Sequence, residues 1–456
     1  MRNREIGARM WTRSRAGSWR SLLALGVVPL VLLSACGSSG SGGGGSSSAA
    51  PAKAHGSVVF WSWAPGMPQV VALFNRSQSA IHVKLGVPPA GDPAYLKMHA
   101  AVKAGNPPDL AHVEFTALPA FQQQAELENL SKLGADSYQR QYIDWTWKQG
   151  NFAGQTYAIP WASGALGLYY RADLLHKYGI SGPPKTWAEF AADAKKVHSA
   201  NPNAYMTFFS ADNFYAQWWM AYPWQAGARW YGTSGNSWTI GMSDPTTSQV
   251  ADYWQKMIDA KQVTSAPTYS TGWFKAIQNG NIVALPAPQW MSALIKSNAP
   301  ALKGKWRVAP LPEWKPGTQA SANYGGSSLA VLKGAKNPAA ALVFAHWLTT
   351  DPAAINIWVS VGDGWPAATG LSKVSALTSP DPYYGGENIN AVFKNMDALV
   401  DKNWKWTPVA DQTFSTLSGH LNDVLSRKTT LKQALAATAG DTVSQLKAKG
   451  LSAKSS

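Results

Sequence analysis

The sequence predicts an α/β fold of two domains, in which mostly parallel sheets are flanked by helices. The chain has 456 residues, more than one hydrophobic core usually organises, and this length suits two domains. Apolar, β-branched runs alternate with segments of helical periodicity in the first part of the chain. This alternation is typical of parallel sheets covered by helices. No fixed-period repeat interrupts it.

The elements of the first part can be taken in order. Residues 57–61 form a short apolar run that predicts a strand, and 67–74 carry apolar residues at helical spacing. Residues 81–85 alternate strictly and predict a second strand. A second helix over 95–105 and a strand over 108–113 complete the pattern. Right-handed crossovers then place the strand ends along one edge of the sheet.

Two later helices have recognisable starts. Thr186 and Glu189 have the spacing of a capping box and predict a helix from this point. Asn337 and Pro338 predict the start of another, whose apolar stripe includes Leu348.

The N-terminus predicts export. Residues 2–20 carry six Arg against one Glu, and 22–33 are apolar and uncharged, as in the n-region and h-region of a signal peptide. The apolar run is shorter than the roughly 20 residues that a membrane-spanning helix needs, so we expect residues 1–35 to be removed. The only cysteine, Cys36, ends a Leu-Ser-Ala-Cys sequence that resembles the bacterial lipobox. This resemblance implies a lipid anchor on Cys36 and a position at the cell membrane, on its extracytoplasmic face.

Residues 36–55 are predicted to be a tether, because they are rich in Gly, Ser and Ala and cannot bury apolar surface. The net charge of the chain is +15. Its Lys and Arg are scattered and form no basic run, so we expect no nucleic-acid partner.

No catalytic or metal-binding motif is present in the sequence. The eight His show no His-x-x-x-His or His-Glu spacing, and neither Gly-x-Ser-x-Gly nor a phosphate-binding Gly-Lys-Ser/Thr loop occurs. We therefore predict no cofactor, no metal and no enzyme activity. One alternative stays open, because a glycosidase also uses two carboxylates that face each other across a cleft as its catalytic residues. Glu114 with Asp212 is the pair that we would nominate for it.

Five segments carry a resemblance, at about residues 60–75, 105–110, 157–190, 325–328 and 344–350. Taken in order across about 300 residues, they resemble the extracellular solute-binding proteins of ATP-driven sugar importers, the family that includes maltose-binding protein. The resemblance implies a fold like that of periplasmic binding proteins, with two lobes and a ligand cleft between them. It implies a first lobe over 56–162 and 312–360, and a second over 165–308 and 361–452.

The function that the resemblance implies is the capture of a di- or oligosaccharide. The protein would deliver this sugar to the permease subunits of an ABC transporter that is driven by a separate ATPase. We expect it to act as a monomer. The alternative within the same fold is a protein that binds a polyamine or an iron chelate, and the low number of acidic residues argues against it.

Tryptophan supports a sugar ligand independently of the resemblance. The chain has 23 Trp, and a sugar ring packs its C–H face on an indole while its hydroxyls reach polar groups. The alternative is that most of these residues belong to the core.

The candidate ligand-binding residues follow strand ends or lie at expected crossings between the lobes. Carboxylates were included because they accept hydroxyl protons in strong hydrogen bonds, and two glycines because only glycine lets the backbone approach a ligand closely. At the first crossing Gly164 stands where maltose-binding protein is acidic, so a maltose-like set of contacts is not expected. The candidates are Trp63, Glu114, Thr116, Trp161, Ser163, Asp212, Asn213, Trp230, Gln289, Trp290, Gly325, Gly326 and Trp365.

Overall fold

The computed structural model describes residues 54–456. The predicted signal peptide, Cys36 and most of the tether lie outside this part of the chain. No helix between residues 54 and 456 has both the length and the apolar character that a membrane crossing requires.

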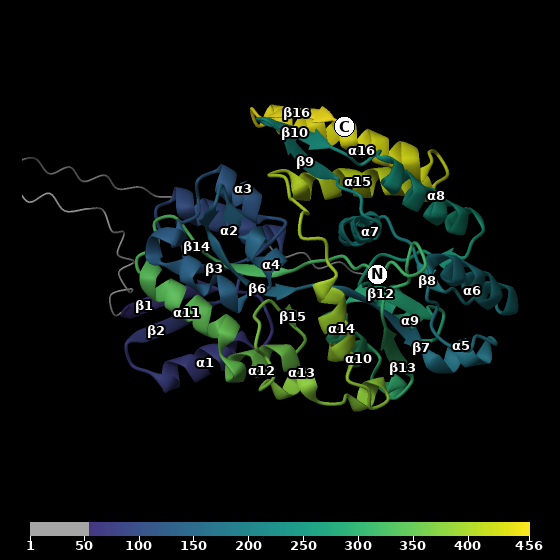
Figure 1. The fold of residues 1–456 in the computed structure, drawn as a ribbon, viewed down its shortest axis with the longest axis horizontal. Helices are drawn as coiled ribbons and strands as arrows, with labels where there is room; N and C mark the ends of the chain where they lie inside the picture. The colour runs from purple at the N-terminus through teal and green to yellow at the C-terminus, as the bar shows by residue number, and fades with distance from the viewer. Residues whose placement is uncertain (1–53) are drawn as a thin grey trace, which may run out of the picture. The chain divides into compact units, whose positions relative to one another are not determined.

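The largest sheet has six strands in the order β15-β6-β14-β3-β1-β2 (Figure 1). Its strands come from segments far apart in the sequence, and the last of them lies about 300 residues after the first. Their bounds are β1 Gly56–Trp61, β2 Ile81–Gly86, β3 Leu110–Glu114, β6 Ala158–Ser163, β14 Ser327–Val331 and β15 Trp365–Pro366.

The predicted strand–helix alternation of the first part is confirmed. β1 pairs in parallel with β2 and with β3, and the helices α1 (Met67–Ser77) and α2 (Asp92–Lys103) connect these strands. The carboxyl ends of β1 and β3 therefore lie next to each other at one edge of the sheet.

The sheets are less parallel than expected. β14 pairs antiparallel with β3 and β6, and β15 pairs antiparallel with β6. A helical crossover fixes the direction of β1, β2 and β3, whereas β14 and β15 enter the sheet from distant segments that no such crossover joins to their neighbours.

A second group of strands lies beside the first, on the right of Figure 1. Its central sheet has the order β12-β7-β13 and is antiparallel throughout. A small sheet, β16-β10-β9, brings the C-terminal strand onto a hairpin. The bounds are β7 Leu166–Arg171, β8 Thr207–Phe208, β9 Tyr231–Ser234, β10 Ser237–Ile240, β11 Val263–Thr264, β12 Ala284–Pro288, β13 Trp306–Ala309 and β16 Ser452–Ser455. The strands β4 Asn151–Phe152 and β5 Gln155–Thr156 form a separate hairpin that does not belong to this group.

Helices cover both groups of strands (Figure 1). Between α2 and β14 these are α3 Leu118–Gln123, α4 Asp144–Gln149, α5 Ala172–Lys177, α6 Trp187–Ala200, α7 Asn213–Gln225, α8 Pro245–Asp259, α9 Thr271–Gln278 and α10 Met291–Asn298. After β14 they are α11 Pro338–Thr350, α12 Pro352–Ser360, α13 Ser375–Thr378, α14 Ile389–Ala398, α15 Ala410–Leu425 and α16 Leu431–Ala448.

The two predicted helix starts are confirmed. α6 begins after Thr186, whose side chain accepts a hydrogen bond from the backbone N–H of Glu189. The Glu189 carboxylate accepts from the N–H of Lys185 instead of that of Thr186, so the reciprocal bond of a capping box does not form. α11 begins at Pro338.

Most of the tryptophans serve the core. Eleven of them are among the largest fully buried side chains: Trp145, Trp161, Trp187, Trp218, Trp219, Trp224, Trp230, Trp254, Trp273, Trp306 and Trp358. The abundance of Trp is therefore mainly a property of packing, and only individual residues can bear on a ligand.

The lobe boundaries stay a prediction. One pairing differs from the expected division, because β15 lies in the range 361–452 assigned to the second lobe and yet pairs with β6 of the six-stranded sheet.

Candidate functional site

A cavity of about 460 Å³ lies between the six-stranded sheet and helices that cover the second group of strands. Strand ends and loops of the six-stranded sheet supply one part of its wall. Helices α7, α10 and α15 and the segments around them supply the other. Its lining includes Trp63, Asp92, His112, Glu114, Ser163, Asn213, Phe214, Gln217, Tyr269, Trp290, Tyr324, Gly325, Gly326, Ser327, Asp363 and Asp411.

Trp63 is held in place by a neighbouring histidine. It follows β1, and its indole stacks on the imidazole of His112 with ring centroids 4.0 Å apart and an interplanar angle of 17°. His112 also pairs through Nε2 with Ser327 Oγ, at 2.8 Å. Burial lowers the pKa of His112 to about 3, so the imidazole is neutral at physiological pH. The pair thus offers a fixed aromatic surface without a positive charge.

Glu114 ends β3 and is also fixed by a neighbour. The hydroxyl of Tyr95 donates to Glu114 Oε2 at 2.8 Å. Burial raises the pKa of Glu114, this hydrogen bond opposes the rise, and the charge of Asp92 adds to it. The carboxylate keeps accepting capacity for hydrogen-bond donors in the cavity.

The first turn of α7 presents polar and aromatic side chains to the cavity. The helix begins here because Asp212 caps it, with Oδ1 accepting from the N–H of Tyr215 at 3.0 Å. Asn213, Phe214 and Gln217 follow and line the cavity. Phe214 is 56% exposed, one of the few large apolar side chains that stay open to solvent. An exposed ring at the wall of a polar cavity is suited to stack on a ligand.

Trp290 and two tyrosines form a second aromatic wall. The indole N–H of Trp290 donates to the carbonyl of Tyr324 at 3.2 Å, and the hydroxyls of Tyr269 and Tyr324 are 3.2 Å apart. These contacts orient the rings before any ligand arrives.

Close backbone contacts explain the glycines around this wall. A Cβ at Gly164 would lie 1.9 Å from the carbonyl oxygen of Tyr324, so no other residue fits there. Gly326 has a φ of +90°, and a Cβ on it would come within 2.7 Å of the Phe115 ring. Packing thus requires glycine at position 164. This accounts for Gly164 at the position where maltose-binding protein has an acidic residue.

Two further carboxylates line the cavity from the C-terminal part of the chain. Asp363 follows α12, and burial raises its pKa well above the ordinary range. Asp411 lies in the first turn of α15. Burial, and then repulsion from Asp92 and Glu114, raises the pKa of Asp411 to about 7.

The sequence of residues 61–355 matches the family model described as bacterial extracellular solute-binding protein. The chain belongs to this family. The cavity is therefore the cavity of a solute-binding protein, and the family and its relatives are binding proteins rather than enzymes.

Curated relatives of the chain carry names of transporter-binding proteins. A probable ABC transporter-binding protein of Deinococcus radiodurans is 31% identical over 201 residues, which are 43% of this chain and 48% of the relative. The lactose-binding protein of Rhizobium radiobacter is 26% identical over 52% of this chain and 56% of its own length. The chain thus spans about half the length of these relatives. An arabinooligosaccharide-binding protein of Halalkalibacterium halodurans is 23% identical over 71% of this chain and 73% of its own.

Solved structures confirm the two-lobed α/β fold. The ABC transporter-associated binding protein of B. animalis subsp. lactis, solved with β-1,6-galactobiose, matches with a TM-score of 0.76 and 26% identity over 87% of this chain and 99% of its own. The galacto-N-biose/lacto-N-biose I-binding protein of Bifidobacterium longum has a TM-score of 0.78 and 24% identity over 88% and 99%.

In this solute-binding protein, the cavity brings together seven of the thirteen candidate residues that the sequence suggested. They come from the loop after β1, the ends of β3 and β6, the start of α7, the residue before α10 and the turn before β14. They are Trp63, Glu114, Ser163, Asn213, Trp290, Gly325 and Gly326.

The other six candidates do not line the cavity, and three of them are engaged in structural hydrogen bonds. Asp212 accepts from Tyr215, Ser210 and Thr268. Trp230 is fully buried and donates to Thr247 Oγ1, and Gln289 donates to Asn390.

Packing accounts for the remaining three candidates. Thr116 and Trp161 are 5% and 1% exposed, and Trp161 lies behind His112, which it meets edge-on. Trp365 is 6% exposed and borders a different cavity, of about 580 Å³.

The sequence reasoning missed several residues of the wall. Phe214 directly follows the candidate Asn213, and Asp363 lies two residues before the candidate Trp365, so both lie next to residues that the sequence suggested. His112 lies in a predicted strand, where its neighbour Trp63 could not be foreseen. Asp411 gave no signal, because its proximity to Asp92 depends on where α15 packs.

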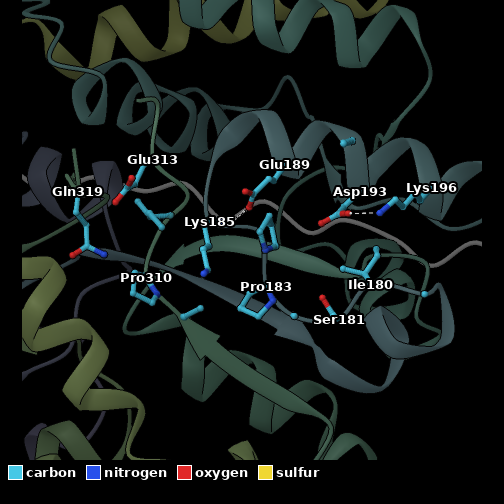
Figure 2. A pocket seen from close by; sticks show the side chains of 16 residues that line it. Ile180, Ser181, Pro183, Lys185, Glu189, Asp193, Lys196, Pro310, Glu313 and Gln319 are labelled. Atoms are coloured by element: carbon cyan, nitrogen blue, oxygen red, sulfur yellow. Dashed lines mark hydrogen bonds and ion pairs between the residues drawn. The ribbon is translucent and has the colours of Figure 1, made fainter. Parts of the chain in front are cut away.

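A larger cavity, of about 820 Å³, lies away from this site (Figure 2). Segments 179–196 and 309–319 form it, and Figure 2 shows Lys185, Glu189 and the Asp193–Lys196 ion pair around it. Among the described residues, no aromatic side chain lines it. We therefore assign the ligand site to the smaller cavity. Its aromatic and polar lining suits an organic solute, whereas the larger cavity offers only a greater volume.

Proposed function

We propose that this protein captures a di- or oligosaccharide outside the cytoplasm and delivers it to an ABC importer. One observation carries the proposal. The cavity sets the aromatic side chains of Trp63, Phe214 and Trp290 beside the carboxylate of Glu114 and the amide of Asn213. Apolar ring faces together with hydrogen-bonding oxygens at their edges are what a saccharide requires.

The size of the cavity and the relatives support this proposal. A volume of about 460 Å³ falls in the usual range for small-molecule sites, roughly 300 to 1,000 Å³. The relatives named above include proteins for lactose and arabinooligosaccharides, and the structural neighbours were solved with disaccharides.

We infer the transport mechanism from the two sides of the cavity, which come from different parts of the fold. A ligand that contacts Trp63 and Glu114 on one side and Phe214 and Asp411 on the other binds best when these sides are close together. Such a ligand stabilises the closed arrangement by its differential affinity. The permease subunits, with their separate ATPase, would receive the closed, loaded form.

We propose binding without turnover. The nominated pair for glycoside hydrolysis does not assemble, because Asp212 caps α7 and does not line the cavity that contains Glu114. Liberation of shorter sugars from an oligosaccharide that binds, detected by chromatography, would contradict this statement.

The low number of acidic residues in the chain does not by itself exclude a polyamine ligand, because four acidic residues line this one cavity: Asp92, Glu114, Asp363 and Asp411. The aromatic walls of the cavity and the relatives therefore support a sugar ligand, and the number of acidic residues does not.

We also propose that the protein is a monomer held at the membrane by a lipid on Cys36. Its sequence context is the support for this anchor. The Cys36→Ser variant should move from the detergent phase to the aqueous phase in detergent phase partitioning. Partitioning of the unchanged protein into the aqueous phase would contradict the anchor.

A thermal-shift screen tests the function. A ligand that binds only the folded state stabilises it by about 2.7 kcal/mol at 100 times its Kd. We expect at least one di- or oligosaccharide to raise the melting temperature of the full chain clearly. A shift with spermidine or a ferric chelate, and with no sugar, would contradict the proposal.

A further inference from the structure

Every Asp, Glu, Lys or Arg side chain in the described lining of the cavity is acidic. Asp92, Glu114, Asp363 and Asp411 line it, and no Lys or Arg between residues 54 and 456 does so. His112 also lines it but is neutral, as shown above. The whole chain has 40 Lys and Arg against 25 Asp and Glu, so the acidic cavity runs counter to the composition of the protein.

Three of these carboxylates repel one another, and no described basic side chain pairs with them. Asp92 opens α2, Glu114 ends β3 and Asp411 lies in the first turn of α15. The charges of Asp92 and Glu114 both act on Asp411. In the described part of the chain, none of the three forms an ion pair with a Lys, Arg or His. Uncompensated charges of one sign in a partly buried cavity disfavour the ligand-free state.

Two buried acceptor atoms in the same wall also have no partner. Asp363 Oδ2 and Asn213 Oδ1 are both buried and have no hydrogen-bond partner among residues 54–456. A buried polar atom without a partner costs free energy. Asn213 Oδ1 points independently to a ligand that donates a hydrogen bond, and the buried Asp363 carboxyl to a polar ligand group beside it.

The cluster does not have the form of a metal site. Within residues 54–456, no three His, Cys, Asp or Glu side chains are grouped closely enough to hold a metal ion. The carboxylates are instead spread around a cavity that also contains Trp63, Phe214 and Trp290. Aromatic faces with separated carboxylates suit an organic cation that has a ring to stack and ammonium groups at its edge.

We propose that the saccharide taken by this cavity is an amino sugar: a di- or oligosaccharide with at least one protonated amine. This inference rests on the proposed function and names its substrate class. The amine would lie among Asp92, Glu114 and Asp411, while a ring of the sugar stacks on Phe214 or Trp290. The acidic group would thereby select for charge, and the aromatic walls for a saccharide over a flexible polyamine.

Calorimetric titration of the full chain, purified in detergent, tests this with three disaccharides that differ at C2. Chitobiose carries amines, N,N′-diacetylchitobiose carries acetamides and cellobiose carries hydroxyls. Spermidine and pairs of amino and neutral sugars with α-linkages complete the panel. We expect an amino disaccharide to bind at least tenfold more tightly than its neutral counterparts, and added salt to reduce the difference.

Two variants on one helix locate the effect. Asp411→Asn should lower the preference for the amino sugar about tenfold, which corresponds to roughly 1.4 kcal/mol. Asp423→Asn is the matched control, because Asp423 lies on the same helix, pairs with Lys428 and does not line the cavity. It should leave the preference unchanged. Glu114→Gln serves as a second variant if Asp411→Asn fails to fold.

The outcomes separate this inference from the proposed function. Equal or tighter binding of a neutral sugar would overturn the inference and leave the sugar-binding function intact. An unchanged preference in folded Asp411→Asn and Glu114→Gln would also overturn it. Binding of spermidine alone, or of no member of the panel, would contradict both the inference and the proposed function.

Discussion

Asp397 should make the stability of this protein depend on pH, and replacement by asparagine should remove that dependence. The residue is 1% exposed and accepts a hydrogen bond from the hydroxyl of Ser163 at 2.5 Å. Burial raises its pKa from the ordinary 3.8 to about 7, against the opposing effect of that hydrogen bond. The folded state therefore holds a proton at pH values where the unfolded chain has lost it.

The sign and size of the effect follow from this pKa. As pH rises from about 4 to about 7, the folded state becomes less stable relative to the unfolded state, and above pH 7 the loss is complete. One pKa unit corresponds to 1.36 kcal/mol, so the loss is up to about 4 kcal/mol. Asparagine has no proton to lose and can still accept from Ser163.

The assay is chemical unfolding at two pH values. We expect Asp397→Asn to be close to the wild type near pH 4 and more stable by up to about 4 kcal/mol near pH 8. Asp423→Asn is the control, since Asp423 is 44% exposed, and it should stay within about 0.5 kcal/mol of the wild type at both values. An Asp397→Asn effect of the same size at both pH values would refute the reasoning.

Two further predictions concern the cavity wall. Gly164→Ala should prevent folding or lower the melting temperature strongly, because its Cβ would lie 1.9 Å from a carbonyl oxygen. The control Gly182→Ala should fold normally, because no described atom lies within 4 Å of the position of its Cβ. Equal melting temperatures of the two variants would contradict the packing argument. Phe214→Ala should weaken calorimetric sugar affinity at least tenfold, about 1.4 kcal/mol, at an unchanged melting temperature. Trp230→Ala should instead lower unfolding free energy by roughly 3–5 kcal/mol, and the opposite pattern would reverse the two roles.

The fold was predictable wherever local patterns decide it. The alternation over residues 57–113 predicted the parallel direction of β1, β2 and β3, because parallel neighbours need a crossover connection such as a helix. It did not predict their order, β2-β1-β3. The pairing of β14 with β3 joins residues about 200 positions apart. No local pattern encodes such a pairing, and its antiparallel direction could not be derived.

The site was predictable by segment more than by side chain. Trp63 and Glu114 follow or end strands that the alternation predicts, Ser163 lies at a crossing that the resemblance implies, and all three line the cavity. Trp230 was misleading, because a buried indole and a ligand-stacking indole look alike in sequence. Asp411 could not be predicted from the sequence, since only tertiary packing brings α15 close to Asp92 and Glu114.

The central claim is that the cavity between Trp63, Phe214 and Trp290 holds a saccharide. The most direct measurement is a crystal structure of the protein with the sugar that raises its melting temperature most. We predict a sugar ring stacked on Phe214 or Trp290, with hydroxyl or amine groups donating to Glu114 or Asp411. A sugar bound instead in the cavity beside Lys185 and Glu313, with this site unoccupied, would contradict the account.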